Sequence, residues 1–295
     1  MTHVLPRALK GYTSIDGGVT PDVLPPLSGL IITSTQLSET LPSITLCNDI
    51  TTRGGRAYTT LGTHPTRSNG IGDVEEYRRV FEEVAVEHWY KGEGRGSIIA
   101  WGELGLDYDR LEFSNKEDQM AGLTLQLDLI NSMRERHGIN LPLFLHSRNC
   151  GPDLFDILAQ NDVKKHNSLI IHSFDDSVEL MEKYLSLNER TYIGFNGCSL
   201  RTSANLDVVR ACPAERMLLE TDSPYCDIRA THASYPYVTT KFDTTKDKKW
   251  NGSMVKGRNE PVSIVQVLEV VEGVRGESVR GVVAGNVDRC FFGGV

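Results

Sequence analysis

The regular alternation of short apolar runs with longer segments of helical periodicity is the feature that most constrains the fold. Seven runs are rich in Val, Ile, Leu and aromatic residues, and each is near-continuously apolar over four to seven residues. Such continuous apolarity is typical of strands that are covered on both faces, as in parallel sheets. The runs lie at residues 29–35, 57–64, 97–103, 141–147, 168–174, 191–197 and 216–222.

Segments with helical spacing lie between these runs. Residues 73–90 place Tyr77, Phe81 and Val84 on one stripe, as expected for a helix that buries one face. Residues 115–138 begin with acidic side chains and end with basic ones followed by a glycine, which are helix start and stop signals. Further helices are expected near 152–160, 176–187, 203–210, 261–274 and 277–291.

Strands that alternate with helices predict the α/β class, with parallel strands and crossover helices. An eighth strand would complete a TIM-type (β/α)8 barrel, and it should precede residue 28. The stretch at 11–29, "GYTSIDGGVTPDVLPPLSG", is instead rich in Gly and Pro, which predicts a loop. We therefore expect one barrel domain over residues 1–295, with 1–28 as a divergent N-terminus and the first strand not identifiable, either missing or replaced.

Composition narrows the class of protein. A chain of 295 residues with 39% apolar content can bury a single large core. The net charge of -8 argues against non-specific coating of nucleic acid, which needs many cationic contacts with phosphates. Six cysteines without a C-x-x-C pair suggest free structural thiols in a reducing compartment. The chain shows no signal peptide and no membrane-spanning run, so we expect a cytoplasmic or nuclear protein with no membrane association.

Four of the apolar runs end on ionisable side chains: Glu103, His146, His172 and Asp222. The carboxyl ends of barrel strands share one rim, so these side chains should converge there. Two imidazoles and two carboxylates suit a divalent cation such as Mg²⁺, Zn²⁺ or Mn²⁺. The structural alternatives are hydrogen-bonded rim histidines and carboxylates that cap a following helix, a role open to Glu103 or Asp107 in "GELGLDYDR".

Other side chains near this rim suit substrate contacts. His64 ends the run at 57–64, and Arg148 lies two residues past His146, where it could hold a phosphate or pair with a carboxylate. Residues 225–260 combine basic side chains with interleaved aromatic ones, among them Lys249 and Trp250. This composition predicts a groove for single-stranded nucleic acid, and a long solvated loop is the alternative.

The chain resembles the TatD family of metal-dependent deoxyribonucleases through "GELGLDYDR", "LPLFLHSRN", "IIHSF" and "LLETDSPY", supported by "GTHPTR", "YIGFNGCSL" and "GRNEP". The resemblance extends from about residue 28 to the C-terminus and is nearest to the eukaryotic branch. It implies an amidohydrolase-type barrel and a magnesium-supported 3′–5′ exodeoxyribonuclease that acts on single-stranded DNA or 3′ ends.

The resemblance also implies a role for each site residue. Glu103, His146 and His172 would bind a cation, and Glu103 could bridge two. Asp222 would bind a second cation or orient the attacking water, which makes Glu103 and Asp222 the catalytic pair. His64 would contact the substrate.

One departure from the family pattern keeps alternatives open. The chain has neither the D-x-H-x-H nor the D-I-G-x-N-L-T stretch that family members carry on the first strand. An inactive pseudoenzyme that lacks this strand is one alternative. A metal-dependent hydrolase of an ester or amide, on a small molecule or an aminoacyl-tRNA, is the other, because one fold supports many chemistries.

Overall fold

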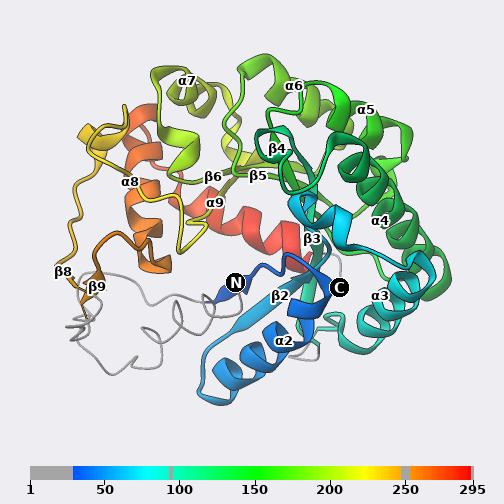
Figure 1. Ribbon diagram of the computed structural model, residues 1–295. Helices are drawn as coiled ribbons and strands as arrows, with labels where there is room; N and C mark the ends of the chain where they lie inside the picture. Colours follow the sequence, from blue (N-terminus) through cyan, green and yellow to red (C-terminus); the bar gives the residue numbers. More distant parts are fainter. Residues whose placement is uncertain (1–28, 93–95, 247–252, 294–295) are drawn as a thin grey trace. The chain divides into compact units, whose positions relative to one another are not determined.

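The structure is a computed structural model that describes residues 29–92, 96–246 and 253–293 (Figure 1). The predicted contacts Lys249 and Trp250 and the predicted N-terminal segment 1–28 lie outside the described residues. In the described part, seven strands follow one another in chain order within one sheet. They are β1 (Leu30–Ile32), β2 (Ala57–Leu61), β3 (Ile98–Asp107), β4 (Leu143–Arg148), β5 (Leu169–His172), β6 (Thr191–Phe195) and β7 (Met217–Leu219).

Each predicted run overlaps one of these strands, and the pairs from β1–β2 to β5–β6 are parallel. The predicted helices are also present: α3 (Val74–His88), α4 (Lys116–His137), α5 (Asp153–Gln160), α6 (Val178–Leu187), α7 (Ser203–Ala211), α8 (Ile264–Arg275) and α9 (Arg280–Val287). A π-helical turn, Asp288–Phe292, follows α9. The stretch predicted to form a nucleic-acid groove contains a short 3-10 turn, Tyr235–Tyr237, and two paired strands, β8 (Thr244–Thr245) and β9 (Met254–Val255).

Local signals explain where the two long helices begin and end. The Asp73 side chain accepts hydrogen bonds from the backbone N–H groups of Glu75 and Glu76, which caps α3. Asn115 caps α4 in the same way through the N–H of Asp118. Gly138 ends α4 in the left-handed conformation, with φ of 68°.

One helix was not predicted. Helix α2 (Leu37–Thr52) contains Pro42 and buries Thr40 and Ser43 beside Ile44 and Cys47. Because half of its buried face is polar, apolar side chains do not recur with helical spacing. A proline inside the segment also argues against a continuous helix when only the sequence is considered.

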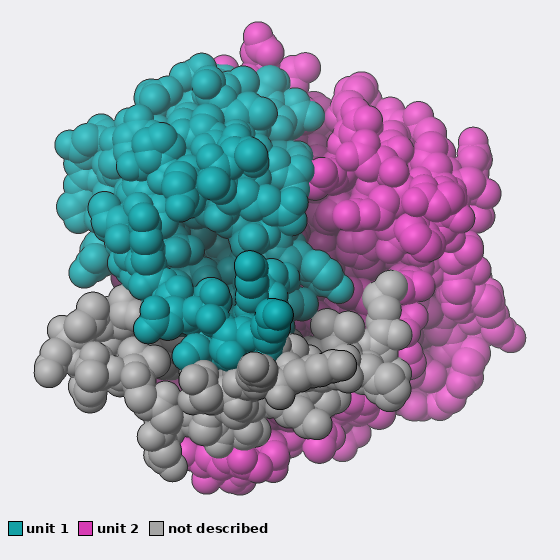
Figure 2. All heavy atoms as spheres, turned by 60° about the vertical axis from the view of Figure 1, so that its left-hand side comes forward, with its two compact units in different colours: residues 1–27, 173–178, 194–283 teal, residues 28–172, 179–193, 284–295 magenta. Residues whose placement is uncertain are grey.

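The chain divides into two compact units, which Figure 2 colours separately. Of the described residues, one unit comprises 29–92, 96–172, 179–193 and 284–293, and the other comprises 173–178, 194–246 and 253–283. In the first unit, all ten residues of β3 are buried. The fully buried Trp101 of this strand stacks on Phe81 of α3, with ring centroids 5.6 Å apart.

Among the described residues, no helix is both long enough and apolar enough to span a membrane.

Candidate metal centre

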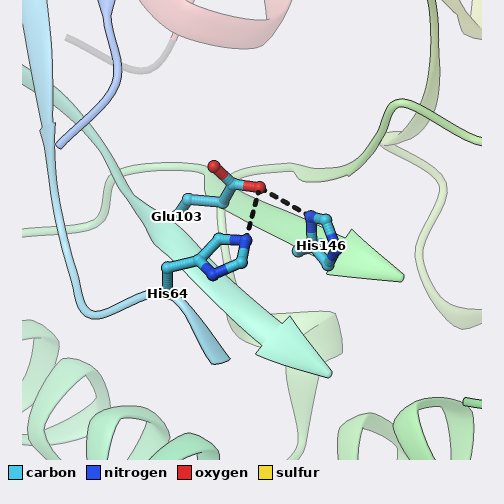
Figure 3. A group of neighbouring side chains, drawn as sticks. All are labelled: His64, Glu103 and His146. Carbon is cyan, nitrogen blue, oxygen red and sulfur yellow. Dashed lines mark hydrogen bonds and ion pairs between the residues drawn. The ribbon is translucent and has the colours of Figure 1, made fainter. Parts of the chain in front are cut away.

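A buried carboxylate lies among imidazole rings at the carboxyl ends of neighbouring strands. Figure 3 shows Glu103 of β3 with His146 of β4 and His64, which follows β2. The Glu103 Oε1 atom lies 2.7 Å from His146 Nδ1 and 3.5 Å from His64 Nε2. One donor atom from each of the three residues lies within 4.8 Å of the others, so one cation could be bound by all three.

A third imidazole approaches the same oxygen atom. His172 Nε2 lies 3.6 Å from Glu103 Oε1, and the parallel register of β4 and β5 pairs His146 directly with His172. The predicted convergence of Glu103, His146 and His172 is therefore present in the structure. Their binding of a metal stays a proposal.

Strand β3 is longer than predicted, and it does not end at Glu103. It continues to Asp107, and the register between β3 and β4 shifts between Trp101 and Leu104, next to Glu103. Such irregularities re-aim side chains and are frequent beside active sites. The prediction ended the strand too early because a carboxylate within a buried strand is rare without a nearby partner.

A glycine makes the close approach of β3 and β4 possible at this point. Gly105 pairs with His146 and has a φ of 144°, which side-chain-bearing residues rarely adopt. A Cβ atom at Gly105 would lie 2.0 Å from the backbone oxygen of His146. Because Gly105 has no side chain, the backbone of His146 can lie directly against β3.

Asp107 is the functional neighbour that sequence reasoning missed, since it was considered only as a cap. Its Oδ1 does accept the N–H of Asp109 as a cap, but its Oδ2 lies 3.2 Å from His146 Nε2. Arg110 also donates to this Oδ2 at 2.6 Å. The available signal was the strand period of two, which puts residues 103, 105 and 107 on one face.

Two glutamines of α4 fix the backbone next to these residues. The Gln119 side chain accepts the N–H of Asp107 at 2.7 Å and donates to its C=O at 2.8 Å. The Gln126 side chain does the same for Thr63, the residue before His64, at 2.6 Å and 3.1 Å. Because both glutamines are buried, these four bonds position the two segments that carry His64 and Asp107.

The pKa shifts in the cluster follow from this geometry. Burial alone would raise the pKa of the Glu103 carboxyl, but the imidazoles around it lower the pKa well below its usual range. Burial would likewise raise the pKa of Asp107, yet its bonds with His146 and Arg110 lower it to about 2. Both carboxylates are therefore anionic at neutral pH and need a positive partner nearby.

The pKa values of His64 and His146 are shifted in opposite directions. Burial lowers the pKa of His64 to about 4, against the attraction of Glu103. For His146, the hydrogen bonds with Asp107 and Glu103 outweigh burial, and the pKa is raised. The structure thus places His64 in a candidate ligand position, and its predicted contact with substrate stays a prediction.

This donor set fits a divalent cation. It offers a buried anionic carboxylate oxygen with imidazole nitrogens around it, which is the mixture of oxygen and nitrogen ligands that Zn²⁺, Mn²⁺ or Mg²⁺ sites use to differing degrees. The hydrogen bonds of His146 with Asp107 and Glu103 favour its protonated form and raise its pKa against the effect of burial. A cation bound there would displace the proton from the ligand nitrogen.

The acid pair after β7 belongs to the other compact unit. Glu220 Oε1 accepts the backbone N–H of Ser173 at 2.6 Å, so this carboxylate holds the chain after β5. Asp222, at a φ of 53°, accepts a hydrogen bond from the Cys226 thiol at 3.1 Å. The role of Asp222 as a ligand or catalytic group stays a prediction.

Arg148 was predicted to hold a phosphate or to pair with a carboxylate. Its Nε donates to Asp109 Oδ2 at 3.0 Å, and Asn149 donates to the other oxygen of the same carboxylate. The carboxylate pairing is present, and a phosphate contact of Arg148 stays a prediction.

Sequence comparisons connect the chain with known proteins. A profile of the family described as TatD related DNase matches residues 27–292. The chain is 38% identical over 223 residues to the Deoxyribonuclease Tat-D of Schizosaccharomyces pombe, a match that covers 73% of this chain and 68% of that protein. It is 27% identical over 254 residues to the 3'-5' ssDNA/RNA exonuclease TatD of Escherichia coli, covering 85% of this chain and 81% of that protein.

Solved structures give the same relationship at the level of the fold. A hydrolase TatD family protein from Entamoeba histolytica superimposes with a TM-score of 0.78 at 29% identity, over 98% of this chain and 88% of the other. An uncharacterized amidohydrolase from Saccharomyces cerevisiae gives a TM-score of 0.77 at 29% identity, over 89% and 87% of the two chains. These similarities confirm the predicted α/β fold of the TIM-barrel type.

Proposed function

We propose that this chain, which belongs to the TatD-related DNase family, hydrolyses phosphodiester bonds in DNA with the help of divalent cations. Membership of the family and the shared fold support a hydrolase of phosphodiester bonds, and the names of the relatives support nuclease activity. The proposal includes digestion in the 3′ to 5′ direction, with single-stranded DNA or 3′ ends as the substrate.

The geometry around one oxygen atom carries this proposal. Glu103 Oε1 lies within 3.6 Å of nitrogen atoms from His146, His64 and His172. All four side chains are largely buried, although burial of a carboxylate costs several kcal/mol without compensation. A purely structural role would need far fewer ionisable groups at one point. A cation site explains why three imidazoles and a carboxylate share this space.

The chain's own residues would have distinct tasks. Glu103, His146 and His172 would hold the cation, with His64 as a fourth donor or a contact for the substrate. Asp222 would hold a second cation or orient the attacking water, as the other member of the catalytic pair. A bound divalent cation lowers the pKa of water, polarises a phosphoryl oxygen and stabilises the leaving oxygen.

Asp107 would act on the ligand His146 rather than on the substrate. A carboxylate that bonds the second ring nitrogen of a ligating histidine fixes its tautomer and its ring orientation. Asp107 has the required contact, 3.2 Å from His146 Nε2, and the two bonds from Gln119 hold its backbone.

Substrate contacts would come from groups beyond the cluster. Arg148 would bind a phosphate, because a guanidinium matches the geometry of phosphate oxygens. Lys249 and Trp250 would contact a phosphate and stack on a base, because cations with interleaved aromatic rings suit single strands. We further propose Mg²⁺ as the activating ion, with Zn²⁺ or Mn²⁺ as substitutes, and a location in the cytoplasm or nucleus.

The test uses a single-stranded oligonucleotide labelled at its 5′ end. We expect stepwise shortening in the presence of Mg²⁺, no reaction in EDTA, and no reaction when phosphorothioate linkages protect the 3′ end. Glu103→Gln should abolish the shortening. Glu117→Gln is the matched control because Glu117 is an exposed acid in the first turn of α4, and this variant should digest like the wild type.

Two outcomes would count against the proposal. Digestion by Glu103→Gln at the wild-type rate, with Mg²⁺ present, would remove the carboxylate from the mechanism. Absence of DNA digestion by a wild-type preparation that hydrolyses p-nitrophenyl esters in a Glu103-dependent way would favour an ester hydrolase instead.

A further inference from the structure

Two cysteines that are distant in the sequence meet in the unit that contains residues 194–283. Cys198 begins the 3-10 turn Cys198–Leu200, and Cys226 lies four residues after Asp222. Their sulfur atoms are 2.8 Å apart, and neither cysteine is in a disulfide bond. A disulfide bond has an S–S distance of about 2.05 Å, so less than an ångström of movement separates the pair from a covalent link.

The backbone brings the two thiols together at a glycine. A Cβ atom at Gly197 would lie 2.0 Å from the backbone oxygen of Cys226, so no larger residue could stand beside Cys198 without displacing this segment. The opposite segment is held by Asn259, whose side chain donates to the backbone oxygens of Thr221 and Tyr225 at 2.8 Å and 2.7 Å. The proximity of the sulfurs is therefore built into the fold on both sides.

The chemical surroundings of the two sulfurs differ. Arg201 Nη2 lies 2.8 Å from Cys198 Sγ, and a guanidinium beside a sulfur favours its thiolate. Cys226 donates its thiol hydrogen instead to Asp222 Oδ2, at 3.1 Å. Cys198 is therefore the nucleophilic partner of the pair.

Solvent access distinguishes Cys226 from the other cysteines. Cys226 is partly exposed, whereas Cys47, Cys150, Cys198, Cys212 and Cys290 are buried. A small oxidant can reach Cys226, and Cys198 lies directly behind it.

We propose that Cys198 and Cys226 are an oxidation site that forms a reversible intramolecular disulfide with hydrogen peroxide. Two S–H bonds and the O–O bond of the peroxide break, one S–S bond forms, and the thiol hydrogens leave with the two oxygens as two water molecules. The two sulfurs lose two electrons, which reduce the peroxide. A dithiol reductant reverses the reaction by exchange through a mixed disulfide.

The disulfide would also change the surroundings of Asp222. Oxidation removes the thiol hydrogen that Cys226 donates to Asp222 Oδ2 and pulls the Cys226 sulfur towards Cys198. If Asp222 takes part in hydrolysis, oxidation lowers the activity, and this consequence rests on the proposed function. The formation of the disulfide does not.

The primary test is peptide mass mapping of the wild-type chain. The protein is treated with peroxide at near-stoichiometric amounts, alkylated with N-ethylmaleimide while folded and then in denaturant, and digested. We expect a cross-linked peptide pair containing Cys198 and Cys226, lighter by two hydrogen atoms, which dithiothreitol separates. Full alkylation of both residues after oxidation, or cross-links that do not join them, would overturn the proposal.

Variants separate the disulfide from its consequence. In Cys198→Ser the cross-link cannot form, whereas the matched control Cys212→Ser should still form it. With Mg²⁺ and single-stranded DNA, we expect peroxide to lower wild-type activity at least fivefold, with recovery in dithiothreitol, and to leave Cys198→Ser unaffected. A disulfide that forms without any loss of activity would overturn the link to Asp222. A chain without nuclease activity before oxidation would count against the proposed function, while mass mapping still decides on the disulfide.

Discussion

Two buried histidines, one at the carboxyl end of strand β5 and one shortly before its amino end, have very different surroundings. His172 ends the strand 3.6 Å from Glu103 Oε1. His166 lies three residues before the strand begins, is only 4% exposed, and has no hydrogen-bond partner for either ring nitrogen among the described residues. Burial of an imidazole therefore does not by itself mark a functional site.

The contrast agrees with the general division of labour in parallel barrels. Active sites occupy the carboxyl ends of the strands, and the amino ends serve stability. At the carboxyl ends of β3, β4 and β5, ionisable groups bond to one another. At the amino end of β5, burial is the main cause that lowers the pKa of His166 to about 4, with a smaller contribution from Arg134. The partner of a buried group, rather than its burial, distinguishes the two roles.

The largest expected effect comes from the same substitution at these two histidines. His172→Phe should lower kcat/KM on single-stranded DNA by more than about 100-fold, because it removes a proposed cation ligand. His166→Phe should leave kcat/KM within about threefold of the wild type. The measurement uses Mg²⁺, with folding checked by circular dichroism. Equal losses of kcat/KM in both variants would show that His172 has no functional role that His166 lacks.

A smaller loss is expected from Asp107→Asn at the same carboxyl end. The amide cannot supply the charge that orients His146, so kcat/KM and cation affinity should fall by about 10- to 100-fold. Titration calorimetry with Mn²⁺ and steady-state kinetics would measure both effects. Asp128→Asn, at an exposed acid of α4, is the control and should change neither. Unchanged cation affinity in Asp107→Asn would show that Asp107 does not act through His146.

The pH dependence of stability tests whether His166, before the amino end of β5, is buried in its neutral form. The folded chain holds His166 neutral down to a pKa of about 4, whereas the unfolded chain protonates it near pH 6.5. The unfolded state then binds more protons between these values, so the free energy of unfolding decreases as pH falls from 6.5 to 4. His64 has a pKa of about 4 as well and adds a loss of the same sign.

Each of these histidines contributes a loss of up to about 3 kcal/mol over this window. His166→Phe should therefore remove about half of the decrease caused by the two. Urea unfolding in EDTA at several pH values would measure it. The same decrease in wild type and variant would mean that His166 is not buried in its neutral form.

The smallest expected effect concerns the support behind the centre. Gln126→Leu leaves the backbone N–H and C=O of Thr63 without their buried partner, which should cost about 1–3 kcal/mol of unfolding free energy. Thr124→Ala on the exposed side of α4 should cost less than about 0.5 kcal/mol. Urea denaturation compares the two. Equal costs would show that the Gln126 bonds do not stabilise this segment.

Much of the fold follows from the sequence because parallel strands have a strong local signal. Each of the seven apolar runs overlaps a strand, since a strand covered on both faces is mostly apolar. The meeting of Glu103, His146 and His172 followed from the same reasoning, because parallel strands end at one edge. Helix α2 was missed where this signal fails, since its buried face includes Thr40 and Ser43.

What could not be predicted depends on contacts between distant segments. Asp107 was not assigned to the centre because the extension of β3 past Glu103 depends on pairing with β4. The approach of Cys198 and Cys226 depends on the packing of Gly197 against the Cys226 backbone, which no spacing in the sequence reveals. Both features come from close backbone contacts rather than from local pattern.

Glu103 and the imidazoles around it are proposed to bind a cation. The most direct test is an anomalous difference map of crystals grown with Zn²⁺, recorded on both sides of the zinc absorption edge. We predict a peak about 2.0–2.2 Å from a Glu103 carboxylate oxygen and from nitrogen atoms of at least two of His64, His146 and His172. Zinc peaks only at other side chains, with none beside Glu103, would contradict the account.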